Sequence, residues 1–325
     1  MDKDPILQTI DLKKYFPLSK GLLLRVKTYN RAVDGVNLNI FRGEIFGLVG
    51  ESGCGKTTLG KVIVGLEQPT SGKVIFEGKE ISGSKSKLDY NLRRKIQMIF
   101  QNPYNSFDPR LRILDSLAEA LKAQNVEDKN EMLEKISRML ENVGLTPPEQ
   151  IFLRYPHELS GGQLQRASIA RTLLLNPSFI IADEPTSMLD ASLRAGILNL
   201  LKRLRDENRL TIMLITHDLS AARYLANRIA VMYLGKIVEI GSAEEVIHNP
   251  LHPYTKALLA SLLPLDPLSE EPEVKITGEP RPAVNPIGCR FFDRCPYFMK
   301  DKCDVNTPEL FQVKEDHSVA CFLYK

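Results

Sequence analysis

The amino-acid sequence predicts an α/β protein built on a parallel β-sheet that is covered by helices on both faces. Short apolar segments with the character of buried strands alternate with longer segments that carry leucine and methionine at helical spacing. Strands that alternate with helices in this way form parallel sheets, because a parallel connection needs a crossover segment. The 325 residues suffice for one large domain or two modest ones.

The expected elements begin with two strands near residue 40. Val36, Leu38 and Ile40 alternate with asparagines and predict a half-exposed strand, whereas the apolar residues 44–49 predict a buried strand that ends at Gly50. The other expected strands are residues 72–81 with an internal turn, 178–183, 211–216, 229–233 and 236–240, and the expected helices are 111–123, 130–143, about 164–175 and 191–207.

Composition and charge exclude several classes of protein. Hydrophobic residues make up 43% and charged residues 26%, which excludes disordered and collagen-like chains. The net charge of +3 gives no indication of a nucleic-acid partner. No apolar run approaches the roughly 18 residues of a membrane-spanning helix, and the N-terminal MDKDP does not start a secretion signal. We therefore expect a protein that stays inside the cell and reaches a membrane only through partners.

Residues 50–57 match G-x-x-x-x-G-K-[ST], the phosphate-binding loop motif, between a predicted strand and a predicted helix. Glycines let the backbone N–H groups face a phosphate, and the helix N-terminus adds positive potential. Lys56 is expected to reach the β- and γ-phosphates, and the Thr57 hydroxyl to bind Mg²⁺. Cys54 occupies a free position and has no chemistry of its own. The loop residues expected to contact ATP are Ser52, Gly53, Cys54, Gly55, Lys56, Thr57 and Thr58.

Two acidic residues follow the predicted strand 178–183. An apolar strand that ends in Asp183 and Glu184 places carboxylates at the edge of the sheet where ligands of such folds bind. In a chain that also carries a phosphate-binding loop, Asp183 is expected to hold Mg²⁺, and Glu184 to polarise the attacking water.

A second glycine-rich helix start, LSGGQ, spans residues 159–163. Ser-Gly-Gly before a helix can bind an anion, and because one phosphate needs only one such cradle, we expect the second to serve an ATP held by another subunit. LSGGQ resembles the signature of ABC-type ATPases, and the other motifs follow the order of that family. The resemblance implies a P-loop NTPase core with a RecA-like sheet, an antiparallel β subdomain and a helical subdomain at about 105–170.

The same resemblance implies roles for individual residues. Gln101 matches the glutamine loop, which touches Mg²⁺ and the catalytic water, and His217 matches the histidine that contacts the γ-phosphate. Residues implied to face the partner's nucleotide are Arg154, Ser160, Gly161, Gly162, Gln163 and, in the D-loop, Asp190. Phe16 matches the aromatic residue that stacks on adenine, with Tyr15 as the alternative.

Further segments resemble the dipeptide/oligopeptide importer branch and, within it, the second, F-type ATPase subunit: residues 21–36, 50–61, 99–110, 154–163 and 249–262. The resemblance implies a peripheral, ATP-hydrolysing subunit at the cytoplasmic face of the membrane. Its implied partners are a second ABC ATPase subunit, two transmembrane permease subunits and an extracytoplasmic solute-binding protein, with no nucleic acid. The alternatives are an importer of sugars or nickel from the same branch, a soluble ABC-type ATPase of iron–sulfur assembly, and a metal-sensing module.

Four cysteines gather at the C-terminal end of the chain. The expected organisation is an ATPase domain over residues 1–263, a proline-rich linker over 264–287, and an extension over 288–325. The spacing C-x5-C-x7-C-x17-C leaves an iron–sulfur cluster, zinc or unligated thiols open. The resemblance to peptide-importer ATPases implies a [4Fe–4S] cluster, with zinc as the alternative, and we expect His317 at the surface rather than as a ligand. The four cysteines are Cys289, Cys295, Cys303 and Cys321.

Overall fold

The computed structural model describes residues 4–20, 26–82, 90–260, 278, 284 and 286–325. The chain forms two compact units, Met1–Lys87 with Leu214–Lys325, and Leu88–Met213. Nearly all of the expected linker 264–287, and the start of the segment 21–36, lie outside the described residues.

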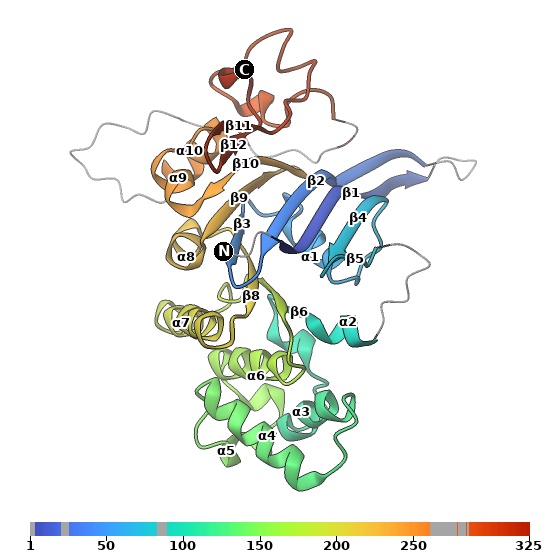
Figure 1. The fold of residues 1–325 in the computed structure, drawn as a ribbon, viewed down its shortest axis with the longest axis vertical. Coiled ribbons are helices and arrows are strands. Elements are labelled where there is room, and N and C mark those ends of the chain that lie inside the picture. Colours follow the sequence, from blue (N-terminus) through green and yellow to red (C-terminus); the bar gives the residue numbers. More distant parts are fainter. Residues whose placement is uncertain (1–3, 21–25, 83–89, 261–277, 279–283, 285) are drawn as a thin grey trace, which may run out of the picture. The chain divides into compact units, whose positions relative to one another are not determined.

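An antiparallel sheet in the first unit contains the N-terminal strands, in the order β2-β1-β4-β5 (Figure 1). The alternation expected around residue 38 is confirmed, because Val36, Leu38 and Ile40 are buried while the asparagines between them are exposed. The expected strand and turn over 72–81 form β4 and β5. The bounds are β1 Pro5–Lys20, β2 Val26–Phe41, β4 Ser71–Phe76 and β5 Lys79–Glu80.

A second sheet in the same unit holds the phosphate loop. β3 (Ile45–Val49) is fully buried and pairs in parallel with β9 (Arg228–Tyr233), as the alternation of strands and helices predicted. β10 (Lys236–Ser242) instead pairs antiparallel with β9, because only Leu234 and Gly235 connect the two strands. The helices of this unit are α1 Lys56–Ile63, α8 Leu219–Leu225, α9 Ala243–His248 and α10 Pro253–Ala260.

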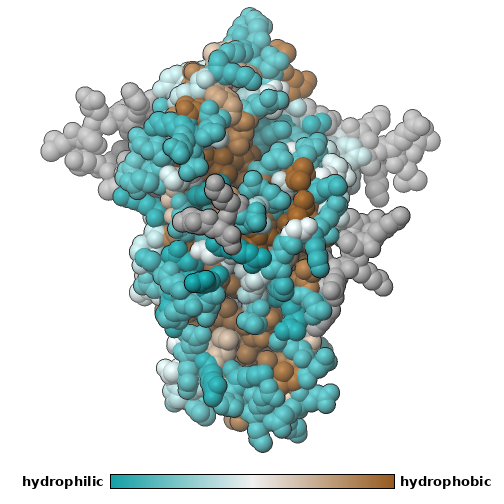
Figure 2. All heavy atoms as spheres, viewed as in Figure 1, coloured by the Kyte–Doolittle hydropathy of each residue, from teal (hydrophilic) through white to brown (hydrophobic). Residues whose placement is uncertain are grey.

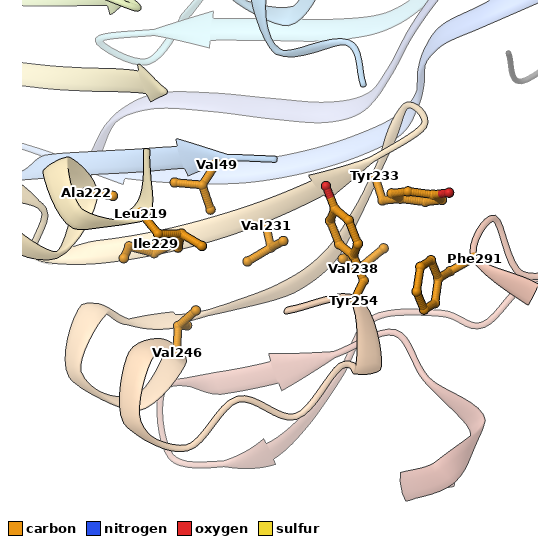
Figure 3. Close-up of a cluster of buried hydrophobic side chains, with 10 residues drawn as sticks. All are labelled: Val49, Leu219, Ala222, Ile229, Val231, Tyr233, Val238, Val246, Tyr254 and Phe291. Atoms are coloured by element: carbon orange, nitrogen blue, oxygen red, sulfur yellow. The ribbon is translucent and has the colours of Figure 1, made fainter. Parts of the chain in front are cut away.

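The C-terminal segment extends this sheet. β12 (His317–Val319) pairs antiparallel with β10, and β11 (Phe311–Lys314) pairs with β12 (Figure 1). Phe291, which lies just before the short 3-10 helix η3 (Phe292–Arg294), is buried with Tyr233 and Tyr254 in a hydrophobic cluster (Figure 3). The C-terminal segment therefore shares a hydrophobic core with β9. A last 3-10 helix, η4, spans Phe322–Tyr324.

The second unit combines two parallel strands with helices. β6 (Ile96–Ile99) pairs with β7 (Phe179–Asp183), and β8 (Thr211–Thr216) carries the chain into the first unit. The expected helices are present. Their bounds are α2 Tyr90–Lys95, η1 Pro103–Ser106, α3 Ile113–Lys122, α4 Lys129–Asn142, α5 Glu149–Phe152, η2 Pro156–Glu158, α6 Gly161–Leu173 and α7 Ala191–Asn208.

Hydrophilic residues cover most of the face that Figure 2 shows, with smaller apolar areas between them. In the described part of the chain, no helix combines the length and the apolar character needed to cross a membrane.

Candidate active site

The phosphate loop joins the buried end of β3 to α1, and two of its glycines are required by close backbone contacts. A Cβ atom on Gly50 would lie 2.2 Å from the carbonyl oxygen of Met232, and one on Gly55, whose φ is +110°, would lie 2.0 Å from that of Ala32. Any side chain at either position would collide with the neighbouring backbone. These are the two glycines that the motif fixes, so packing against β2 and β9 sets the path of the loop.

Lys56 lies across this loop with its side chain buried. Its Nζ donates to the carbonyl oxygens of Gly50 at 2.7 Å and Glu51 at 2.9 Å. No side chain caps the N-terminus of α1, which begins directly after Gly55. The loop therefore offers a helix N-terminus and an ammonium group together, the combination that attracts a phosphate.

Glu51 is fixed by two residues from the far C-terminal part of the chain. Its backbone N–H donates to the Tyr254 hydroxyl at 2.7 Å. Its carboxylate accepts two hydrogen bonds from the Arg294 guanidinium, at 2.9 and 3.2 Å. Sequence reasoning did not find these contacts, because the partners lie about two hundred residues away and belong to no phosphate-loop motif.

The two aromatic residues considered for adenine stacking have different surroundings. The Tyr15 hydroxyl donates to Asp34, which also forms an ion pair with Arg290. Burial and the hydrogen bond to Asp34 raise the pKa of Tyr15 to about 12. The Phe16 ring is half-buried beneath the Lys14 ammonium group, 5.0 Å from its centroid. Tyr15 is engaged in this network, whereas the Phe16 ring contacts the Lys14 ammonium group, and adenine stacking by Phe16 stays a prediction.

In the second unit, Gln101 and Glu184 meet at the carboxyl ends of neighbouring strands. The Gln101 Nε2 donates to Glu184 Oε2 at 3.0 Å. The strand register explains the contact, since Ile99 and Ala182 are paired and each side chain lies two residues further on. Glu184 adopts a left-handed φ of 45°, a strained conformation of the kind found at functional sites. The sequence had selected both residues.

The LSGGQ segment forms the start of α6. Ser160 caps the helix by accepting from the Gln163 N–H, and the Gln163 side chain accepts from the Ser160 N–H in return. This capping box starts the helix at Gly161, three residues before the expected start. Ser160 and Gly161 are exposed, as is Arg154. Asp190 similarly caps α7 by accepting from the Leu193 N–H.

The oxygen-bearing residues expected to bind Mg²⁺ belong to both units. Thr57 lies in the first turn of α1, and Asp183 is the buried last residue of β7. The hydroxyl of Thr57, the carboxylate of Asp183 and the amide oxygen of Gln101 are each the kind of donor that Mg²⁺ prefers, so the chemistry of the predicted ligands fits the ion. His217 is exposed directly after β8, in the first unit.

The four C-terminal cysteines are free thiols that influence one another. Burial raises the pKa of Cys289 to about 12 and that of Cys295 to about 11, with smaller contributions from neighbouring cysteines. The Cys289 N–H also donates to the Cys303 carbonyl oxygen at 2.7 Å. Among the described residues, no three His, Cys, Asp or Glu side chains are grouped so that they could hold one metal ion.

The expectation that His317 lies at the surface is wrong. His317 is fully buried in β12, where its Nε2 lies 2.8 Å from a carboxylate oxygen of Glu239 in β10. The carboxylate of Glu239 also accepts from the backbone N–H groups of Leu251 and His252. A buried carboxylate needs such partners, and this one ties the C-terminal strand to the sheet.

Comparison with known proteins agrees with the motifs. Residues 33–187 match the family described as ABC transporter, and residues 238–303 match the oligopeptide/dipeptide transporter C-terminal region. The chain is 44% identical to the oligopeptide transport ATP-binding protein AppF of Bacillus subtilis, over 99% of this chain and 98% of that protein. It is 43% identical to the dipeptide transport ATP-binding protein DppF of Haemophilus influenzae, over 99% and 97%.

Solved structures show the same fold. The dimeric, post-hydrolysis structure of the ATP-binding cassette MJ0796 with ADP and Pi matches with a TM-score of 0.65 and 29% identity, covering 73% of this chain and 98% of that chain. The structure of CbiO1 from Clostridium perfringens, part of a CbiONQ ABC transporter complex, matches with a TM-score of 0.63 and 29% identity, covering 76% and 92%.

Proposed function

This chain belongs to the ATP-binding subunits of oligopeptide/dipeptide ABC transporters, and we propose that its ATP hydrolysis drives the import of di- and oligopeptides. The contact between Gln101 and Glu184 carries the catalytic part of the proposal, because it holds a carboxylate at a strand end where a nucleotide can bind. The C-terminal match supports peptides over the sugar or nickel alternatives.

Each motif residue has a defined task in this proposal. The phosphate loop and Lys56 bind the β- and γ-phosphates, while Thr57, Asp183 and Gln101 supply oxygen ligands for Mg²⁺. Bound Mg²⁺ neutralises charge on the phosphates. Glu184 accepts a proton from the attacking water, and Gln101 keeps its carboxylate oriented. His217 contacts the γ-phosphate.

A second ATPase subunit completes the site. The residues that face the nucleotide bound by the partner are Arg154, Ser160, Gly161, Gly162, Gln163 and Asp190, and the partner's equivalent segments face the nucleotide bound here. The N-terminus of α6 supports this role, since Ser160 and Gly161 are exposed at a helix start, where positive potential attracts an anion. ATP stabilises the closed dimer, and loss of the γ-phosphate allows it to open.

The remaining partners follow from this family of transporters. Two permease subunits form the membrane path, a solute-binding protein delivers the peptide outside, and this chain binds peripherally at the cytoplasmic face. Cys289, Cys295, Cys303 and Cys321 hold a [4Fe–4S] cluster, for which four thiols are the appropriate donor set. The assignment rests on the donor chemistry alone, since the described side chains are not grouped around one metal ion. Iron and acid-labile sulfide after anaerobic purification test it, and stoichiometric zinc without sulfide would contradict it.

Glu184→Gln tests the catalytic proposal in the purified chain. Because a general base contributes roughly 10²–10⁴-fold, we expect turnover to fall at least about 100-fold while ATP still binds and an ATP-dependent dimer accumulates in size-exclusion chromatography. Glu207→Gln, an exposed residue of α7, serves as the control. Unchanged hydrolysis by the Glu184 variant would remove Glu184 from its role.

A further inference from the structure

Glu51 places a negative charge inside a loop whose task is to bind phosphates. The residue directly follows Gly50 and precedes the backbone N–H groups expected to face the polyphosphate. Like charges in such a cradle repel each other, and the repulsion is strong where water is partly excluded. An unpaired carboxylate here would therefore weaken the binding of ATP and ADP.

The structure pairs this carboxylate with Arg294. Both terminal nitrogens of the guanidinium reach Glu51, at 2.9 and 3.2 Å, in the bidentate geometry that gives strong and directional ion pairs. The side chain of Arg294 is 11% exposed and that of Glu51 is 26% exposed, so the pair is only partly screened by water.

Arg294 is itself held in place by the buried cluster of the C-terminal segment. Its Nη1 donates to the Tyr233 hydroxyl at 3.2 Å, and its guanidinium lies 5.8 Å from the Tyr233 ring centroid and 5.9 Å from that of Phe291. These contacts aim the guanidinium at the phosphate loop. In the sequence, Arg294 directly precedes Cys295, one of the four cysteines.

We propose that Arg294 is a positioning residue for nucleotide binding, which neutralises Glu51 and holds its carboxylate so that the phosphate loop accepts ATP. This inference rests on the proposed role of residues 50–57 as the ATP site. According to this inference, the cysteine-bearing C-terminal segment contributes to nucleotide binding through Arg294.

A second arginine from the same short segment reaches the other end of the expected nucleotide site. Arg290 forms an ion pair with Asp34, which also accepts from the Tyr15 hydroxyl. The side chains of Arg290 and Asp34 are 5% and 7% exposed. Residues 290–294 therefore support both the strand that carries the adenine-stacking candidates and the phosphate loop.

Equilibrium binding of ATP and ADP to full-length variants tests the proposal. We expect Arg294→Ala to raise the Kd for both nucleotides about tenfold, within the usual range of coupling between sites, and to raise KM with little change in kcat. Arg294→Lys keeps the positive charge but loses the bidentate, ring-stacked geometry, so its Kd should lie between those of wild type and Arg294→Ala. Lys314→Ala is the matched control, because it removes another ion pair of the C-terminal segment, with Glu245.

The double variant Glu51→Gln/Arg294→Ala separates charge neutralisation from a merely structural role. Since no carboxylate remains to be neutralised, it should bind ATP within about threefold of wild type. A double variant as weak as Arg294→Ala, or an Arg294→Ala variant that binds as tightly as Lys314→Ala, would overturn the inference.

Lys56→Ala distinguishes this failure from failure of the proposed ATP site. Loss of nucleotide binding in Lys56→Ala together with normal binding in Arg294→Ala would reject only the role of Arg294. Normal binding in Lys56→Ala would reject the site on which the inference rests.

Discussion

His252 makes the stability of the protein depend on pH. The residue is 1% exposed, its ring lies 5.7 Å from that of Phe291, and its Nδ1 accepts from the Tyr254 N–H at 3.1 Å. Burial lowers its pKa from the ordinary 6.5 to about 3. Folding therefore requires the neutral imidazole over the whole range in which an unfolded chain would take up a proton.

The sign and size of the effect follow from proton linkage. Between these two pKa values the unfolded state binds one proton more than the folded state, so the free energy of unfolding falls as the pH decreases. Stability is fully present above pH 6.5. With a folded pKa of about 3, linkage gives a loss of about 2 kcal/mol between pH 8 and pH 5. This is a large part of the roughly 5–15 kcal/mol that stabilises a typical domain.

Urea unfolding of the wild type and of His252→Asn at pH 8, 6.5 and 5 measures this loss. The Asn Oδ1 can still accept from the Tyr254 N–H, and the backbone N–H of residue 252 still donates to Glu239. Loss of ring packing should lower the free energy of unfolding of the variant by the same amount at all three pH values. Other titrating groups contribute equally to both proteins, so their effects cancel in the comparison. Parallel pH profiles for the two proteins would refute the reasoning.

Two further predictions concern packing. Gly55→Ala should abolish nucleotide binding and lower the melting temperature, because the added Cβ would lie 2.0 Å from the Ala32 carbonyl oxygen. Gly43→Ala is the control and should bind nucleotide normally, because Gly43 has a similarly positive φ but its added Cβ would have no atom within 4 Å. Phe291→Ala should lower the free energy of unfolding in urea by about 3–5 kcal/mol, since the ring is fully buried. Phe298→Ala should lower it far less, because Phe298 is 42% exposed. Equal losses in the two variants would contradict the core position of Phe291.

Much of the fold could be predicted because its signals are local. The alternation around Leu38 and the apolar run before Gly50 each indicate one strand, and both strands are present. The antiparallel pairing of β9 and β10 could also have been predicted from the length of their connection. A connection of only Leu234 and Gly235 is too short for a parallel crossover, and both residues have positive φ, as a tight hairpin requires.

The candidate site divides in the same way. Gln101 and Glu184 follow adjacent parallel strands, so a motif together with the sheet register is enough to bring them together. The partners of Glu51 could not be predicted, because Arg294 lies 243 residues away and has no motif of its own. His317 was misplaced for a related reason. A histidine among polar residues suggests a surface loop. His317 can be buried because Glu239, on the neighbouring strand β10, provides a hydrogen-bond partner.

The contacts of the C-terminal segment argue that it cannot fold independently of the ATPase strands. β12 pairs with β10, Phe291 is buried against Tyr233 of β9, and Arg294 forms an ion pair with Glu51 of the phosphate loop. Small cysteine-rich segments commonly depend on a metal for stability because they lack a core. The C-terminal segment instead packs Phe291 into the core of the sheet that carries the phosphate loop. A change that displaces Arg294 should therefore release Glu51, and we expect a weaker affinity for nucleotide as its measurable consequence.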